Sequence, residues 1–103
     1  SHVEIAEMIM QIVNLKSQLP EEELLAIAQE RASHFRAIPG LLQKYYVDKP
    51  GEGEYAGVYI WDSRQSLDEF RESDLAKSIA AAYEVSEAPV VEVGDILLSL
   101  REV

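Results

Sequence analysis

The chain has 103 residues, the length of one domain, and its hydrophobic content of 48% is enough for a core without metal or disulfide support. It has no cysteine, which excludes disulfide bonds, thiolate nucleophiles and cysteine-ligated metal sites. Its formal net charge of −10 argues against nucleic acid, anionic membranes and polyanionic substrates, because these need clustered Lys and Arg. A neutral or weakly acidic organic molecule, or a protein partner, remains compatible with this charge, which also serves solubility.

From the sequence we expect neither a membrane span nor an N-terminal signal peptide. No apolar run approaches the roughly 20 residues of a membrane span, and the N-terminal residues lack the basic segment and cleavage site of a signal peptide. Together with the absence of cysteine, this fits a cytoplasmic protein. Ser1 and His2 resemble the remnant of a purification tag, so we give His2 no role and expect residues 1–103 to form a single domain.

The first half of the chain predicts a strand, a helix and a strand. Residues 6–15 are rich in Met, Ile and Val, which favours a strand. Pro20 and the three glutamates after it indicate a helix start, because proline suits a first turn and acidic side chains favour the positive end of the helix dipole. The helix is expected to end at Pro39 and Gly40, and residues 41–47 form the second strand. The apolar stripe of this helix comprises Leu24, Ala28, Ala32 and Phe35.

A hairpin and the start of a second helix follow. Residues 48–54 contain two glycines and a proline, which predicts a turn region leading into a third strand at residues 55–61. Either Asp62 or Ser63 caps the next helix, and Gln65 would complete a D-x-x-Q capping box.

The last segments predict a broken helix and a final strand. Ser73 and Asp74 indicate a break and a second cap. The helix then continues at helical spacing through Leu75, Ile79 and Tyr83. Residues 88–103 are expected to form the fourth strand, bent at Gly94.

This order of elements predicts an α+β, ferredoxin-like βαββαβ fold, with a four-stranded antiparallel sheet and two helices on one face. Two helices cover only one face of such a sheet, so its strands should alternate between apolar and polar residues. Instead, the segments 8–13, 57–61 and 95–100 are apolar on both faces. The second face therefore needs a cover, and we expect a homodimer that packs sheet against sheet.

Two adjoining segments carry a family resemblance. "IPGLLQKYYV" (38–47) followed by "AGVYIWDSRQSLDEF" (56–70) resembles the YdhR-type putative mono-oxygenase family, and the resemblance extends over residues 6–100. That family belongs to the dimeric α+β barrel superfamily, alongside the antibiotic-biosynthesis mono-oxygenases. The resemblance implies a dimeric α+β barrel with a pocket between sheet and helices in each subunit. In several members this pocket holds flat aromatic molecules that are oxidised by O₂ without flavin or metal. Other members degrade heme, and many have no known activity.

The sequence contains no recognisable set of metal ligands and no motif for binding a nucleotide cofactor. The heme-degrading branch carries a Trp on the second helix and an iron-ligating His ten residues later, and the matching positions here are Phe70 and Ala80. His2 and His34 are the only histidines, so no metal-ligand spacing can be built. The chain also lacks a Walker loop and a G-x-G-x-x-G motif. We therefore expect neither a metal nor a cofactor.

Aromatic residues are the candidates for a substrate pocket, because cofactor-free oxygenation needs a substrate that is deprotonated, held flat and kept dry. Tyr59 and Trp61 are two residues apart on a strand and share one face, while Val58 and Ile60 share the other. β-branched residues suit a dry dimer interface, so we place the two rings on the pocket side. Other available rings are Phe35, Phe70, Tyr83 and either Tyr45 or Tyr46. The alternative is that these rings fill the core or the dimer interface.

His34 is the natural candidate for a general base, since its ordinary pKa lies near 7. We expect His34 and Tyr59 as catalytic residues, and Arg31, Phe35, Trp61, Phe70 and Tyr83 as substrate-binding residues. His34 alternatively lies exposed at the edge of the first helix, where the dipole favours it. Arg31 either extends from the core edge to water or reaches a substrate oxygen.

Two functions follow from these residues. The first is a cofactor-independent mono-oxygenase that acts on a small aromatic or polycyclic substrate. The second is a non-catalytic small-molecule-binding or regulatory module of the same fold. A proton acceptor that faces the aromatic pocket would distinguish them, and if His34 points to water the enzyme loses its expected base.

Overall fold

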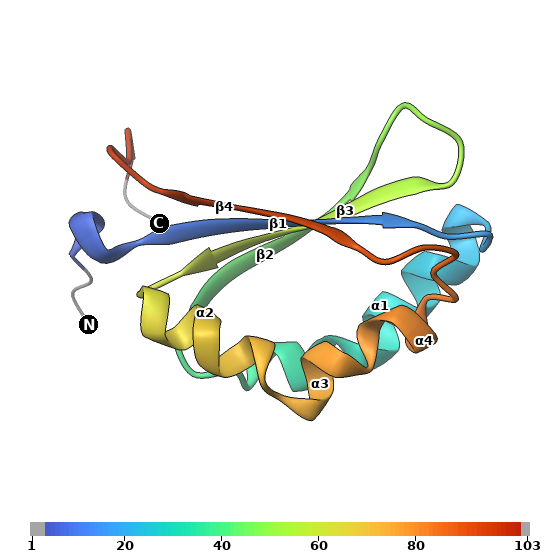
Figure 1. Ribbon diagram of the computed structural model, residues 1–103, viewed down its shortest axis with the longest axis horizontal. Helices are drawn as coiled ribbons and strands as arrows, with labels where there is room; N and C mark the ends of the chain where they lie inside the picture. Colours follow the sequence, from blue (N-terminus) through green and yellow to red (C-terminus); the bar gives the residue numbers. More distant parts are fainter. Residues whose placement is uncertain (1–3, 102–103) are drawn as a thin grey trace.

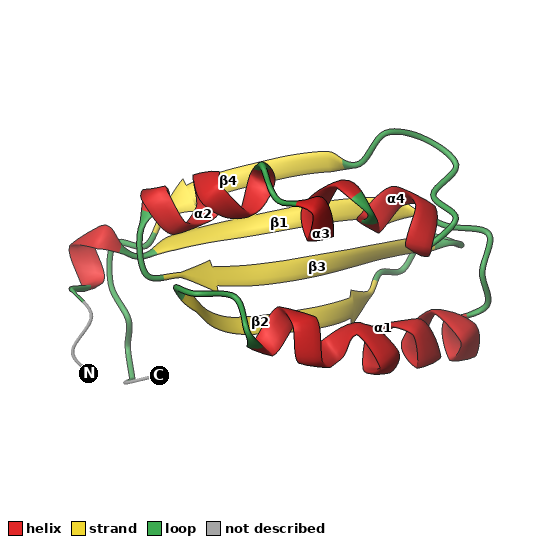
Figure 2. Cartoon of the chain, turned by 90° about the horizontal axis from the view of Figure 1, so that it is seen from below, coloured by secondary structure: helices red, strands yellow, loops and turns green. Residues whose placement is uncertain are grey.

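The computed structural model describes residues 4–101 and forms one four-stranded antiparallel sheet with all its α-helices on one face (Figures 1 and 2). The strands lie in the order β2-β3-β1-β4. This arrangement is the ferredoxin-like α+β fold, so the predicted fold class is confirmed. In chain order the elements are η1 (Ile5–Glu7), β1 (Ile9–Lys16), α1 (Glu21–Arg36), β2 (Leu41–Asp48), β3 (Glu54–Trp61), α2 (Arg64–Arg71), α3 (Asp74–Lys77), α4 (Ile79–Ala82) and β4 (Val90–Asp95).

Some sequence predictions fall outside this range. Ser1 and His2, which we interpret as a tag remnant, precede the described residues, and residues 102–103 of the predicted last strand follow them. No helix within residues 4–101 is long and apolar enough to span a membrane.

The central strands alternate between two faces, and the face under the helices holds the core. On β3, Tyr55, Tyr59 and Trp61 are buried and belong to one cluster with helix residues such as Leu67 and Phe70. Tyr59 and Trp61 therefore lie on the helix side of the sheet. The odd-numbered side chains of β1 complete this layer, because each faces a helix-side residue of β3 across the ladder.

α1 begins and ends where the sequence changes character. Pro20 is the N-cap, one position before the first turn, and the three glutamates occupy that turn. The helix ends at Arg36, and the chain turns at Gly40, which has a φ of +82°. A Cβ at Gly40 would lie 2.1 Å from Ser66 Oγ, so both the backbone angle and the close approach of α2 require glycine here.

α2 begins at a serine cap. Ser63 is the N-cap, because its hydroxyl accepts a hydrogen bond from the Ser66 N–H at 3.2 Å. Asp62 instead accepts a hydrogen bond from the Ser66 hydroxyl at 2.6 Å. The predicted D-x-x-Q box does not form, since the Gln65 side chain donates to Glu69 one turn further on. The open choice between the two caps is thereby resolved in favour of Ser63.

The rest of the second helical region is divided into two short helices. Ser73 caps α3 and accepts from the Ala76 N–H at 3.1 Å, as the predicted break requires. Ser78 then separates α3 from α4, and Tyr83 ends the region as the C-cap of α4. The predicted continuous spacing from Leu75 to Tyr83 is therefore interrupted by one residue outside either helix.

The first and last strands are shorter than predicted. β1 starts at Ile9, because the residues before it form η1, and β4 covers six residues of the predicted range 88–103. The last ladder contact is the Ile96 N–H bond to the Met8 carbonyl at 3.0 Å. Beyond it, η1 offers no strand to pair with, and the chain leaves the sheet at the same end as η1 (Figure 1). Three leucines of this segment are highly exposed: Leu97 at 93%, Leu98 at 75% and Leu100 at 87%.

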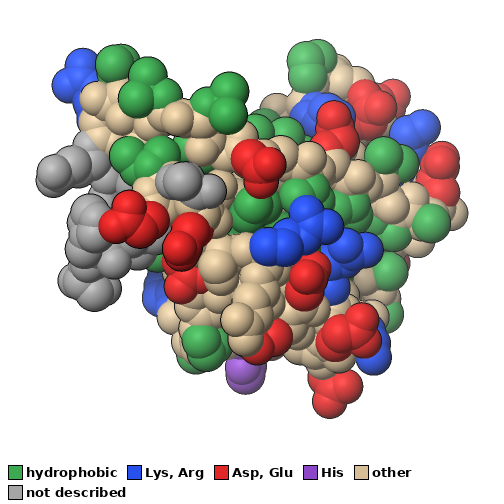
Figure 3. Space-filling view, turned by 60° about the vertical axis from the view of Figure 1, so that its left-hand side comes forward, with side chains coloured by type: hydrophobic (Ala, Val, Ile, Leu, Met, Phe, Trp, Pro, Cys, Tyr) green, Lys and Arg blue, Asp and Glu red, His purple; other side chains and the backbone are tan. Residues whose placement is uncertain are grey.

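The sheet face away from the helices has an apolar centre. Met10 pairs with Ile60 and Ile12 pairs with Val58 across β1 and β3, and all four side chains lie on this face. Figure 3 shows apolar side chains at the surface on the sheet side of the molecule. No described element of the chain covers this face, which preserves the reason for expecting a dimer.

Candidate functional site

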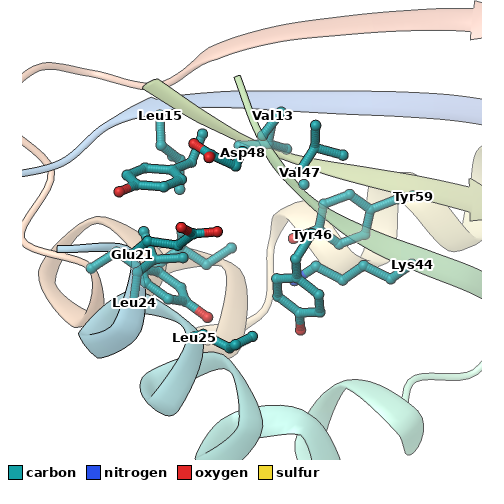
Figure 4. Close-up of a pocket in the computed structure, with 15 residues that line it drawn as sticks. Val13, Leu15, Glu21, Leu24, Leu25, Lys44, Tyr46, Val47, Asp48 and Tyr59 are labelled. Carbon is teal, nitrogen blue, oxygen red and sulfur yellow. The ribbon is translucent and has the colours of Figure 1, made fainter. Parts of the chain in front are cut away.

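A small cavity opens between α1, β2 and the helix side of the central strands (Figure 4). Its volume is about 80 Å³. Its walls are mostly apolar and aromatic, with residues such as Val13 and Leu24 on opposite sides. In Figure 4, Lys44, Tyr46 and Tyr59 lie on one side of the cavity, and the carboxylates of Glu21 and Asp48 lie on the other. The cavity thus combines an apolar body with polar groups of opposite charge.

The cavity exists because one position of β3 has no side chain. Gly57 faces the helix side between Tyr55 and Tyr59 and lines the cavity. A Cβ at this position would lie 3.1 Å from the Tyr59 ring and 3.5 Å from Lys44 Cε. Any larger residue would therefore occupy space that is now open.

Lys44 projects from β2 into the aromatic layer. Its Nζ lies 3.5 Å from the centre of the Phe35 ring, 4.3 Å from that of Tyr46 and 4.5 Å from that of Tyr59. Burial, and then the nearby charge of Arg31, lower the pKa of Lys44 from 10.5 to about 7. The neutral amine is therefore far more populated at neutral pH than in an ordinary lysine.

Three tyrosines that line the same cavity as this amine have raised pKa values. Burial raises the pKa of Tyr46, Tyr59 and Tyr83, and for Tyr59 the other two tyrosines raise it further. These hydroxyls stay protonated at neutral pH and can donate hydrogen bonds. The Tyr83 hydroxyl is buried beside Arg31, and burial raises the pKa of Tyr83 more than the charge and hydrogen bonding of Arg31 lower it.

Arg31 lies behind the cavity wall. Its Nη2 donates to the Ser78 hydroxyl at 2.8 Å, and its Cζ lies 5.9 Å from the ring centres of both Phe35 and Tyr83. Its Nε is buried without a hydrogen-bond partner among the described residues. The guanidinium is therefore turned inward against the helix layer, and it influences the cavity mainly through its charge.

The aromatic residues expected at the site divide into three groups. Tyr59 and Tyr83 line the cavity, whereas Phe35 packs behind them with its ring centre 6.5 Å from that of Tyr59. Trp61 and Phe70 lie deeper in the core, 5.2 Å apart between ring centres, and neither lines the cavity.

Trp61 is fully buried, at 0% exposure. Its ring stacks on Tyr59 at 5.9 Å, and its Nε1 donates to Gln11 Oε1 at 2.9 Å. These contacts make it a core residue that supports Tyr59 from behind. A Trp61→Ala substitution would therefore remove core volume, in addition to any effect on binding that we expected from the sequence.

His34 lies on the exposed surface of α1 and does not line the cavity. Of the two expected catalytic residues, only Tyr59 reaches the cavity. Neither Lys44 nor Gly57 was identified from the sequence as a residue of the site. A glycine inside a strand is a signal for close approach that could have indicated Gly57. A lysine in an apolar strand is usually read as a solvent-facing residue.

Within residues 4–101, no group of three or more His, Asp or Glu side chains could hold a metal ion.

Fold and cavity together define the class of protein, a ferredoxin-like α+β domain with a polar-tipped aromatic cavity beneath its helices. A family model described as "Putative mono-oxygenase ydhR" matches residues 9–93, and the chain belongs to this family. No curated protein matches its sequence.

Solved structures share the fold. One, described as a putative antibiotic biosynthesis monooxygenase from Caulobacter crescentus, is 25% identical with a TM-score of 0.74, and the match covers 91% of this chain and 93% of that one. SnoaB, a cofactor-independent oxygenase from Streptomyces nogalater, is 13% identical with a TM-score of 0.74 and coverages of 94% and 100%. The NE2512 protein of unknown function from Nitrosomonas europaea is 14% identical with a TM-score of 0.77 and coverages of 97% and 99%.

Proposed function

We propose that the protein is a cofactor-independent mono-oxygenase that oxidises a small aromatic molecule in this cavity, with Lys44 as the proton acceptor. Membership of the mono-oxygenase family supports the reaction class, and the similar fold of SnoaB, a cofactor-independent oxygenase, supports the absence of a cofactor. The observation that carries the proposal is the Lys44 amine, which faces an apolar cavity with a pKa of about 7.

Lys44 takes the part that His34 was expected to play. A general base works best when its pKa lies near the operating pH, and Lys44 meets this condition inside the aromatic layer. The hydroxyls of Tyr59 and Tyr83 remain protonated and would donate to the oxygen of a phenolate or enolate as its charge develops. The apolar walls would keep water away from that anion.

The reaction would draw its electrons from the substrate. Lys44 takes a proton from a carbon or hydroxyl of an electron-rich ring, and the resulting anion reduces O₂ while a new C–O bond forms. One oxygen atom stays in the product as a carbonyl oxygen, and the other leaves as water together with the two hydrogens that the substrate loses. The balance requires one substrate molecule and one O₂, with no external reductant.

The size of the cavity limits the substrate. Its 80 Å³ is about half of the roughly 150 Å³ apolar cavity that holds benzene in an engineered protein. An aromatic substrate must therefore extend through the mouth or displace a side chain there. Leu25 and Tyr46 are exposed at this mouth and can turn outward without unpacking the core. A single ring requires the smaller displacement, and a polycyclic substrate would protrude.

The proposal includes a homodimer that packs sheet against sheet. The apolar centre formed by Met10, Ile12, Val58 and Ile60 supports this arrangement, because a second sheet would remove it from water. In such a dimer the two cavities lie on the outer, helix-bearing sides of the two sheets, so each subunit would bind its own substrate.

Oxygen consumption tests this function. The purified protein should consume O₂ with single-ring polyphenols or anthrone in the presence of a chelator, and ¹⁸O₂ should label one oxygen of the product. Lys44→Met should reduce the rate by about 10²-fold or more, the usual contribution of a general base. Lys49→Met is the matched control, because the Lys49 amine is bonded to Asn14 outside the cavity.

The same assay separates the two candidate functions. Quenching of the fluorescence of Trp61 would report ligand binding, since it is the single tryptophan and stacks on Tyr59. Binding without oxygen uptake would contradict the enzyme and support the non-catalytic binding module.

A further inference from the structure

We propose that the Lys44 amine is also a covalent capture site for small aldehydes and ketones, which it binds as imines within the cavity. This activity needs no oxygen and does not depend on the proposed mono-oxygenase reaction. It rests on the position of the amine among its neighbours and on the volume beside it.

Lys44 lacks the partners that keep most lysines charged. Its Nζ makes no hydrogen bond and no ion pair with the described residues, and it is surrounded by the rings of Phe35, Tyr46 and Tyr59. The other three lysines of the sequence differ. Lys16 pairs with Glu87 at 3.5 Å, Lys49 donates to Asn14 at 2.9 Å, and Lys77 is exposed.

The charged groups around Lys44 favour its neutral form. Arg31 approaches it from α1, and the other titratable groups near it are Tyr46, Tyr59 and Tyr83 from β2, β3 and the end of α4. The tyrosines are protonated, and the carboxylates of Glu21 and Asp48 lie on the other side of the cavity. Burial and then Arg31 decide the state of the amine and lower its pKa to about 7. A desolvated lysine beside a second cation is the arrangement that activates an amine as a nucleophile towards carbonyl compounds.

A small carbonyl compound fits the cavity without displacing a side chain. Since 80 Å³ is about half of the roughly 150 Å³ that holds benzene, we expect room for a ligand of about three or four non-hydrogen atoms. Propanal and acetone are of this size. Their alkyl groups would lie against apolar walls such as Leu24 and Val13, and their oxygen could accept from a tyrosine hydroxyl.

The chemistry balances without a further reactant. The amine lone pair attacks the carbonyl carbon, the C=O π electrons move to the oxygen, and one proton passes from the nitrogen to that oxygen to give a neutral carbinolamine. A tyrosine O–H then protonates the hydroxyl, which leaves as water while the nitrogen lone pair forms the C=N bond. The second N–H proton returns to the tyrosine oxygen. One water is released for each carbonyl bound. The product is a neutral imine, which suits a position where burial and Arg31 disfavour positive charge.

Reductive trapping on the intact protein tests the proposal. The protein is incubated at pH 7 with propanal and cyanoborohydride, which converts an imine to a stable propylamine, and the modified residues are mapped by peptide mass spectrometry. We expect Lys44 to be labelled at least tenfold faster than Lys16, Lys49 or Lys77, because a neutral amine is far more abundant at a pKa of about 7 than at the ordinary 10.4. Even labelling of all four lysines would overturn the proposal. The N-terminal amine also reacts near neutral pH and is counted separately.

Two variants sharpen the result. Arg31→Gln should slow labelling of Lys44 at pH 7 several-fold and restore it at higher pH, since removal of the neighbouring charge raises the pKa of the amine. Lys44→Arg should lose the label at this position while Lys49→Arg keeps it. Because the mapping on the natural chain needs no variant, misfolding of a variant leaves the main test intact. If Arg31→Gln leaves the rate and its pH dependence unchanged, the electrostatic basis of the proposal is wrong. Labelling without oxygen uptake in the other assay would support this inference and contradict the mono-oxygenase.

Discussion

The amine of Lys44 lies 3.5 Å from the centre of the Phe35 ring, where a lysine would ordinarily meet a carboxylate or water. The ring attracts a charged amine. Burial and then Arg31 disfavour that charge and lower the pKa of Lys44 to about 7, so the amine titrates near neutral pH. A surface lysine would remain charged, and a lysine paired with Asp or Glu would be more firmly charged still.

The first prediction concerns stability and pH. The pKa of Lys44 is about 7 in the folded chain and about 10.4 in the unfolded chain, so between these values the unfolded chain binds more protons and stability rises with pH. Below pH 7 both states are protonated, and the cost of the buried charge is fully present. Lys44→Met should therefore raise the free energy of unfolding at pH 6 by on the order of 2 kcal/mol, and the gain should disappear near pH 10. Urea denaturation, monitored by Trp61 fluorescence, measures the free energy of unfolding at each pH. Lys77→Met is the exposed control, and a pH-independent difference would contradict the prediction.

A second prediction concerns the space beside Gly57. Gly57→Val should fill much of the cavity and reduce ligand affinity and Lys44 labelling by about tenfold or more, because its side chain would point into a volume of only 80 Å³. Gly94→Val is the matched control, since a Cβ at Gly94 on β4 meets no atom within 4 Å. Calorimetric binding and the trapping assay provide the measurement. Equal effects of the two substitutions would mean that ligands bind elsewhere.

The third prediction separates the core ring from the cavity ring. Trp61→Phe removes the donor to Gln11 and leaves that buried amide oxygen without its partner, at a cost of about 1–3 kcal/mol. Tyr59→Phe removes a hydroxyl that makes no hydrogen bond to the described residues, so the melting temperature should change little. Ligand affinity should instead fall more for Tyr59→Phe than for Trp61→Phe, because only Tyr59 lines the cavity. Circular dichroism melts give the stability of both variants, and binding isotherms give their ligand affinity. If one variant lost more of both stability and affinity than the other, the prediction would be wrong.

The fourth prediction concerns the uncovered sheet face. Light scattering should give twice the chain mass of 11.6 kDa for the natural protein at micromolar concentration. Ile60→Lys should shift it to the single-chain mass or make it aggregate, because a charge would then be buried between two sheets. Glu30→Lys, on the exposed surface of α1, should leave the dimer intact. A natural protein of single-chain mass would exclude the sheet-to-sheet dimer.

Most of the architecture could be predicted from local patterns. The glutamates after Pro20, the Pro39–Gly40 turn and the alternation from Tyr55 to Trp61 each act within a few residues, and each gave the correct element. The length of the last strand was overestimated for a reason that local patterns do not contain. A strand lasts only as long as its neighbour, and η1 removes that neighbour before Leu97.

The central residue of the site could not be predicted because a β-bulge changes the register of β2. Leu41 pairs with Trp61 and Gln43 pairs with Ile60, so Leu42 has no partner of its own. Without this extra residue, strict alternation would point Lys44 at the open face of the sheet and Gln43 at the helices. One inserted residue thus exchanges the two faces of the strand. A single sequence gives no sign of where such an insertion falls.

The position of β2 at the edge of the sheet has a consequence for access to the cavity. β2 is bonded to β3 alone, so it can separate from its neighbour by local opening, at a free energy below that of global unfolding. Lys44 and Tyr46 would move with it, while β1 and β3 keep the floor of the cavity in place. Amide hydrogens of β2 should therefore exchange with solvent sooner than those of β1. Such opening would widen the cavity beyond what the outward turn of Leu25 and Tyr46 provides, and would admit a larger ligand.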